Sequence, residues 1–279
     1  MVGPFLASAL ERLDGALALT IPRVLGNTDG EAIHDMRVAI RRLRTLLRIA
    51  RPVYGKHHAD VVRRAFTRVH RATGELRDEE VLEETLAHVL EDAPELRGWL
   101  TRRGRRLRTL RRDVNALIEA RALDDARRLL TSLLAFPVAP AKDRELGKYA
   151  RKVVRVARRR VERLRDVAER DPLALHELRI AYKELRYAVE IFSEALPIDD
   201  RVLLAPATTF QKRLGEIHDI DVAIEVIRRS RLPVDTRKAA LSGLARRRTR
   251  ALRRYVRELD PLAPGPQDPD PEENGPPAV

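Results

Sequence analysis

The segments IHDMRVAIRRLR (33–44) and LHELRIAYKELR (175–186) are two copies of one pattern. Each copy has a histidine at its second position, an arginine three residues later and further cations at helical spacing after that. Apolar residues recur every three or four positions beside the cations, as they do on the buried face of an amphipathic α-helix. We therefore predict that both segments are helices, each with an apolar face and a basic stripe along its edge.

Two further pairs of segments repeat in the same order along the chain. TGELRDEEV (73–81) matches LGEIHDIDV (214–222), and RRLRTLRRDV (105–114) matches RRTRALRRYV (247–256). Three matched blocks in one order indicate an internal duplication. We expect two similar helical halves to pack as a pseudo-symmetric pair, with equivalent helices facing a shared cleft.

The rest of the sequence favours an all-α fold. Ala, Leu, Arg and Glu dominate, and no stretch shows sustained strand-like alternation. Breaks at glycine and proline, including Gly74 and Gly215, predict roughly ten or eleven helices. We predict a first helical repeat over 1–136, a linker over 137–145, a second helical repeat over 146–258 and a disordered, acidic, proline-rich tail over 259–279.

Composition excludes several classes of protein. The chain has 279 residues, of which 44% are hydrophobic, so it can form a substantial core. It has no cysteine, which excludes disulfides, zinc–thiolate sites, iron–sulfur clusters and a cysteine nucleophile. No apolar run is long enough to cross a membrane, and the N-terminus lacks the basic segment of a signal peptide. We expect a cytoplasmic protein with no membrane partner, no cofactor and no metal site.

The charge of the chain indicates a polyanionic partner. The formal net charge is +13, and residues 260–279 contain five acids and no Lys or Arg. The remainder of the chain therefore carries +18. A positive field of this size attracts polyanions, although a basic surface that serves only solubility remains an alternative.

The two basic stripes are the first candidate binding residues. Neighbouring cations at helical spacing destabilise a helix by about 0.2–0.5 kcal/mol per pair, which is understandable if a ligand supplies negative charge. Arginine binds phosphate oxygens through two hydrogen bonds and lysine acts as a point charge, so a row of them suits a ligand with repeated anionic groups. The alternative is a solvated basic face paired with acids on neighbouring helices. The first stripe contains His34, Arg37, Arg41, Arg44 and Arg48; the second contains His176, Arg179, Lys183 and Arg186, with Glu190 in the place of Arg48.

Other basic blocks add candidates for the same ligand, and each of them is equally compatible with a solvated face. They contribute Arg68 and Arg71 before Gly74, Lys212 and Arg213 before Gly215, Arg108 and Arg112 in the first half, and Arg250 and Arg254 in the second half.

The doubled blocks resemble a known family. The pattern H-x-x-R-[VI]-A-x-[RK]-x-L-R, followed about 40 residues later by G-E-[LI]-[RH]-D, is similar to CHAD, the conserved-histidine α-helical domain. The resemblance covers about residues 1–258. It implies two pseudo-symmetric four-helix bundles with a basic groove between them, binding of inorganic polyphosphate and targeting to polyphosphate granules. It also adds Arg77 and His218, which precede the aspartate of the second motif in each half.

Three rival functions remain open, the third of which is a protein scaffold that uses the acidic tail. The chain contains His34-Asp35 and His218-Asp219, as metal-dependent phosphohydrolases of the HD type do. Asp35 lies about 100° from His34 on a helix, however, and the adjacent arginines would repel a divalent cation. We therefore predict no catalytic residues. Nucleic-acid binding meets the charge requirement, but there is no base-reading motif or aromatic platform, so we expect only weak, sequence-independent binding.

Overall fold

The computed structural model describes residues 1–27, 29–135, 145–168 and 172–258. All regular elements in these ranges are helices, which confirms the predicted all-α fold. Twelve α-helices and one short 3-10 helix are present in the described residues, slightly more than the sequence predicted. The extra helices are short segments such as α3 (Arg51–Tyr54) and α10 (Ile198–Arg201).

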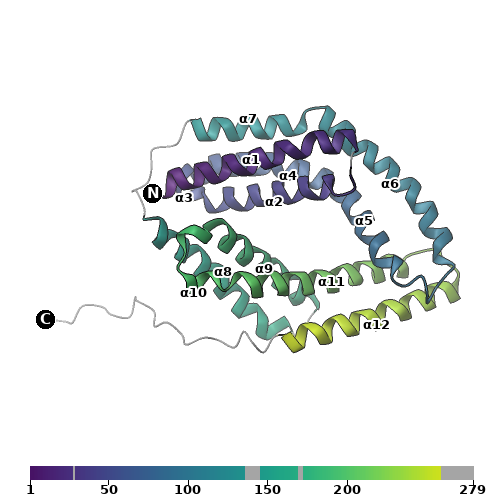
Figure 1. The fold of residues 1–279 in the computed structure, drawn as a ribbon. Coiled ribbons are helices and arrows are strands. Elements are labelled where there is room, and N and C mark those ends of the chain that lie inside the picture. Colours follow the sequence, from purple (N-terminus) through teal and green to yellow (C-terminus); the bar gives the residue numbers. More distant parts are fainter. Residues whose placement is uncertain (28, 136–144, 169–171, 259–279) are drawn as a thin grey trace.

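In the first half, most helices form a bundle, and α5 and α6 extend from it (Figure 1). Helix α1 packs on α2, α2 on α4, and α4 on α7, whereas α5 and α6 pack on each other and extend from this bundle. The remaining helices of this half are α1 (Val2–Gly26), α2 (Ala32–Ile49), α4 (Lys56–Ala72), α5 (Gly74–Ala87), α6 (Leu96–Glu119) and α7 (Ala122–Ala135).

The second half has fewer and longer helices. Its main helices pack in chain order, α8 on α9, α9 on α11 and α11 on α12. They are α8 (Leu146–Ala168), α9 (Pro172–Phe192), α11 (Leu204–Arg228) and α12 (Val234–Glu258), with the 3-10 helix at Ser193–Ala195 before α10. The duplication itself stays a prediction, as do the boundaries of the two repeats. The predicted tail and all of the predicted linker except Glu145 lie outside the described residues.

The predicted break at Gly215 is wrong. Helix α11 runs through Gly215 without interruption, whereas Gly74, at the equivalent place in the first half, follows a break and begins α5. At the first break, the side chain of Arg37 donates to the carbonyl of His70 and to the hydroxyl of the buried Thr73. The bond to the His70 carbonyl satisfies one of the backbone carbonyls that the last turn of a helix leaves without an intrahelical partner. Leu214, which stands where the first half has Thr73, has no hydroxyl to take part in such a turn.

The two halves meet along several contacts. Helix α2 packs on α9, α1 on α8, and α5 on α11 (Figure 1). The turn after α5 also approaches α12 closely, because a Cβ added at Gly243 would lie 2.6 Å from a carboxylate oxygen of Asp92. One continuous cluster of buried apolar side chains extends through both halves. The α2–α9 contact therefore holds the two basic stripes next to each other.

Within the part of the chain that the structure describes, no helix is both long enough and apolar enough to cross a lipid bilayer.

Candidate polyanion-binding site

The contact between α2 and α9 brings cations of both stripes together. Arg41 and Arg44 come from α2, and Arg179 and Lys183 come from α9. Each is partly buried, and the positive charges of Arg41, Arg44 and Arg179 all act on Lys183. We call these four residues the cationic cluster.

Burial and repulsion both disfavour the charged forms in the cationic cluster. Burial is the larger cause and the neighbouring arginines are the second, and together they lower the pKa of Lys183 to about 8. The pKa values of Arg44 and Arg179 are also lowered, again chiefly by burial. The cluster is therefore a place where positive charge is unfavourable in the free protein and an added anion would be stabilised.

The cationic cluster lacks direct counter-ions. Among the described residues, none of its four members forms an ion pair, although the charge of Asp219 acts favourably on Arg179 and that of Glu184 on Lys183. The buried Nε atoms of Arg44 and Arg179 also have no hydrogen-bond partner within the described ranges. Unsatisfied buried donors of this kind are uncommon and need an explanation, such as an ion that binds there.

The far ends of both stripes have carboxylate counter-ions, unlike the cluster. Arg48 pairs with Glu184 at 3.0 Å, across the contact between the halves. Glu190 accepts from Arg42 at 3.2 Å and pairs with Arg186 at 3.4 Å. The alternative of paired surface charge therefore holds for Arg48 and Arg186, but not for the four residues of the cluster.

Arg37 stabilises the turn between α4 and α5 in addition to being part of the first basic stripe. Its Nη1 lies 2.7 Å from the carbonyl oxygen of His70 and 2.8 Å from the Thr73 hydroxyl. Burial lowers its pKa, as it does in the cluster. A substitution of Arg37 would thus affect the turn between α4 and α5 along with any bound anion.

Two of the predicted histidines form a pair beside the cluster. The Nδ1 atoms of His176 on α9 and His218 on α11 are 3.4 Å apart. Burial and the charge of Arg179 lower the pKa of His218 to about 4, and burial and Arg179 also lower the pKa of His176. Both rings are therefore neutral near pH 7 in the free protein. His34 lies half-buried near the start of α2.

His70 and Asp219 are two groups that sequence reasoning did not assign to the site. Burial and the charges of Arg37 and Arg44 lower the pKa of His70 to about 3. Burial raises the pKa of Asp219 to about 6, against the opposing effect of Arg179. The one sequence signal for His70 was its place in the basic block before Gly74.

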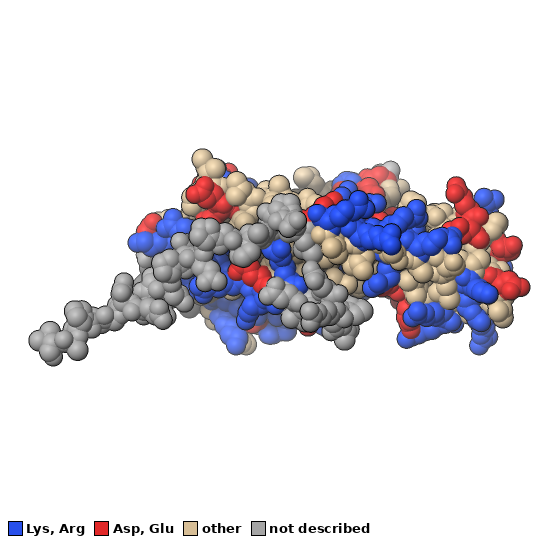
Figure 2. Space-filling model, turned by 90° about the horizontal axis from the view of Figure 1, so that it is seen from below, with Lys and Arg blue, Asp and Glu red and all other residues tan. Residues whose placement is uncertain are grey.

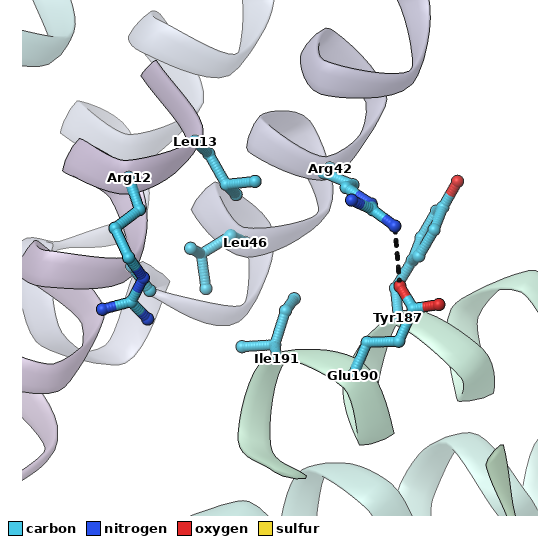
Figure 3. Close-up of a pocket in the computed structure, with 8 residues that line it drawn as sticks. Arg12, Leu13, Arg42, Leu46, Tyr187, Glu190 and Ile191 are labelled. Atoms are coloured by element: carbon cyan, nitrogen blue, oxygen red, sulfur yellow. Dashed lines mark hydrogen bonds and ion pairs between the residues drawn. The ribbon is translucent and has the colours of Figure 1, made fainter. Parts of the chain in front are cut away.

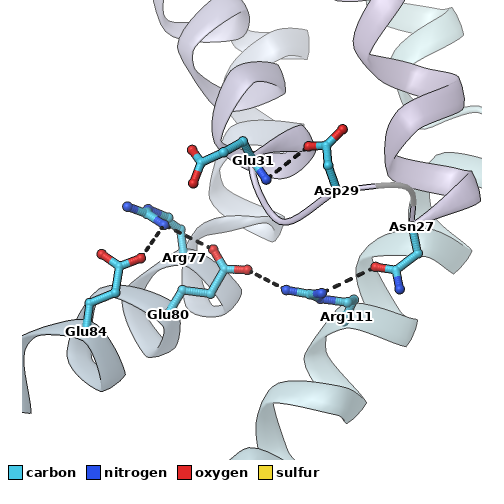
Figure 4. A network of polar contacts seen from close by, with 7 residues as sticks. All are labelled: Asn27, Asp29, Glu31, Arg77, Glu80, Glu84 and Arg111. Carbon is cyan, nitrogen blue, oxygen red and sulfur yellow. Dashed lines mark hydrogen bonds and ion pairs between the residues drawn. The ribbon is translucent and has the colours of Figure 1, made fainter. Parts of the chain in front are cut away.

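Arg77 belongs to a network of ion pairs (Figure 4). Its Nη1 lies 3.3 Å from Glu80 and 3.5 Å from Glu84. Glu80 also accepts from Arg111, which in turn donates to Asn27 (Figure 4). Arg77 is thus already paired with carboxylates in the free protein.

The remaining predicted residues lie on other helices or other faces. Arg213 pairs with Glu258 at 2.9 Å, and Arg254 lies 3.6 Å from Glu216. The others are exposed: Arg68 and Arg71 on α4, Arg108 and Arg112 on α6, Lys212 on α11 and Arg250 on α12. Among these, Arg71 acts on the cluster, because its charge contributes to the lowered pKa of Arg44. Helices α6 and α12 take no part in the α2–α9 contact.

One face of the molecule carries mixed charge. Figure 2 shows broad areas of Lys and Arg on the face seen from below, interrupted by acidic side chains.

A cavity of about 290 Å³ lies between α1, α2 and α9 (Figure 3). It is lined by Ala9, Arg12, Leu13, Arg42, Leu46, Tyr187, Glu190 and Ile191.

Among the residues that the structure describes, no group of three or more His, Asp and Glu side chains is arranged to hold a metal ion.

The fold and the duplicated motifs define an all-α protein with cations gathered at the contact between two helical halves. A sequence model of the CHAD domain matches residues 7–228, and the chain belongs to the CHAD family. No curated protein matches its sequence.

Two solved structures are similar in fold. The CHAD domain from the plant Ricinus communis superposes with a TM-score of 0.75 at 21% identity, over 94% of this chain and 92% of that one. PptA from Streptomyces chartreusis superposes with a TM-score of 0.64 at 19% identity, over 92% of this chain and 99% of that one. At these identities the likeness concerns the fold alone.

Proposed function

We propose that this protein binds inorganic polyphosphate without transforming it. The observation that supports this most is the cationic cluster, which combines two cations from each half with no ion pair among the described residues. Phosphate oxygens would supply the missing acceptors, and hydrogen bonds between charged groups are about twice as strong as neutral ones.

The chemistry of polyphosphate fits the cluster better than that of a single phosphate. Polyphosphate carries one negative charge after another along an unbranched chain, and it has no bases to be read. Cations from α2 and α9 would bind successive phosphates, and Arg71 would extend the positive field beside Arg44. Nucleic acid would share the attraction to the charge, but the cluster contains no aromatic platform for bases.

The residues gathered in the site favour binding over catalysis. Arginine and lysine side chains stabilise phosphate oxygens and repel a divalent metal ion that would have to lie between them. The neutral His176–His218 pair would add hydrogen bonds to the same anion. We further propose that this binding places the protein on polyphosphate granules in the cytoplasm, and that incubation with Mg²⁺ or Mn²⁺ releases no phosphate.

The salt dependence of binding tests the proposal. Each phosphate contact releases a condensed counter-ion, so the logarithm of the affinity for long-chain polyphosphate should fall linearly with the logarithm of the salt concentration. Calorimetric titrations of the full chain over a salt series measure the slope. A slope near zero would contradict the proposed ionic contacts.

A further inference from the structure

Tyr187 lies among three arginines at the contact between the two halves. Its side chain belongs to α9 and is only 1% exposed. The guanidinium carbons of Arg41 and Arg42 are each 6.0 Å from the centre of its ring, and that of Arg186 is 4.9 Å away. Figure 3 shows the ring beside Arg42 and Glu190.

The phenol oxygen of Tyr187 forms a hydrogen bond with one of these arginines, Arg41. It accepts a hydrogen bond from Nε of Arg41 at 2.7 Å, and Arg41 comes from α2 of the opposite half. The guanidinium group is planar, so a bond at Nε, together with the ring beside it, fixes the direction of its other nitrogens. Among the described residues, the side-chain hydrogen bond of Arg41 is the one at Nε, and its two terminal nitrogens have no hydrogen-bond partner.

The neutral character of this acceptor matters for the charge of the site. Arg42 and Arg186, beside the same ring, are paired with the carboxylate of Glu190. Arg41 is held by a phenol instead, so its positive charge is oriented without being cancelled. A carboxylate at the same place would fix the side chain equally well but would reduce its attraction for an anion.

We propose that Tyr187 is a positioning residue that holds Arg41 ready for the phosphates bound by the cationic cluster. This inference rests on the proposed function. An arginine that is already ordered loses less conformational entropy on binding, which strengthens the complex without any contact between Tyr187 and the ligand. The second half thereby organises a cation of the first half.

Tyr187→Phe tests the proposal, because it removes the phenol oxygen and keeps the ring. We expect polyphosphate affinity to fall about 3- to 10-fold, the range for releasing one long side chain. The slope of affinity against salt should stay unchanged, because every cation is still present. The matched control is Tyr182→Phe on the same helix: Tyr182 is equally buried, and its oxygen has no hydrogen-bond partner within the described ranges. That variant should bind as the wild type does.

A double-mutant cycle separates positioning from a general structural role. In an Arg41→Ala background, Tyr187→Phe should have no further effect on affinity, because its target is gone. Additive losses, or an equal loss in Tyr182→Phe, would overturn the inference while leaving the proposed function in place. Failure of the wild type to bind polyphosphate would overturn the proposed function, and the positioning role with it.

Discussion

Replacing Arg44 and Lys183 together by glutamate is expected to weaken polyphosphate binding by at least about a hundredfold at 0.15 M salt. The two residues come from different halves, and neither forms an ion pair among the described residues. A hydrogen bond to a charged group contributes about 1.5–3 kcal/mol, so the loss of two corresponds to a factor of about 10²–10⁴. Calorimetry with long-chain polyphosphate measures the change.

The control for this variant carries the same net charge. Arg102→Glu with Lys238→Glu also changes one cation in each half, but both residues are exposed on α6 and α12. We expect this control to lose much less affinity than the cluster variant. Circular dichroism should show both variants folded, since the glutamates of the cluster variant can pair with Arg41 and Arg179 and those of the control are exposed. Equal losses in the two variants would show that affinity comes from overall charge and not from the cluster.

Raising the pH from 7 to 9.5 is expected to weaken polyphosphate binding through the titration of Lys183. Its pKa in the free protein is lowered to about 8, so a growing fraction of the protein is neutral at this position above that pH. A bound anion favours the protonated form, and the affinity should therefore fall by up to about tenfold per pH unit above 8. Titrations in a series of buffers at constant ionic strength measure this profile.

The variant Lys183→Arg tests whether Lys183 is the group whose titration changes the affinity for polyphosphate. Arginine stays protonated over the whole range, so the variant should bind with little pH dependence between 7 and 9.5. A profile that is the same in the variant and the wild type would exclude Lys183 as the titrating group.

The stability of the free protein should respond to the same titration in the opposite direction. Between pH 8 and 10.5, the unfolded chain keeps the proton of Lys183 and the folded chain loses it. The unfolded state then binds more protons, so the contribution of Lys183 to the free energy of unfolding rises with pH in this window. Binding weakens over the same range, so the two effects are readily distinguished.

Much of the site followed from helical spacing in the sequence. The duplicated pattern placed Arg41 and Arg44 on one stripe and Arg179 and Lys183 on its equivalent, and the structure brings these four residues together. Periodicity is a local property, and it predicts which side chains share a face of a helix.

The rest of the site depends on how the halves pack, which local patterns do not contain. Glu190 takes the place of Arg48 in the second stripe, and the structure shows that it also pairs with Arg42 of the first half. Helical spacing did not single out Tyr187, because its bond to Arg41 arises from contacts between segments far apart in the chain. The break at Gly74 was predicted correctly and the one at Gly215 was not, because a glycine alone does not end a helix whose packing continues on both sides.

We propose that the cationic cluster recognises a phosphate chain and not polyanions in general. A competition titration with long-chain polyphosphate and duplex DNA, at equal phosphate concentration and 0.15 M salt, tests this directly. We predict that polyphosphate binds much more tightly, and that Arg44→Glu with Lys183→Glu removes most of the difference. Equal affinity of the wild type for the two polymers would contradict the account and favour a general polyanion-binding surface.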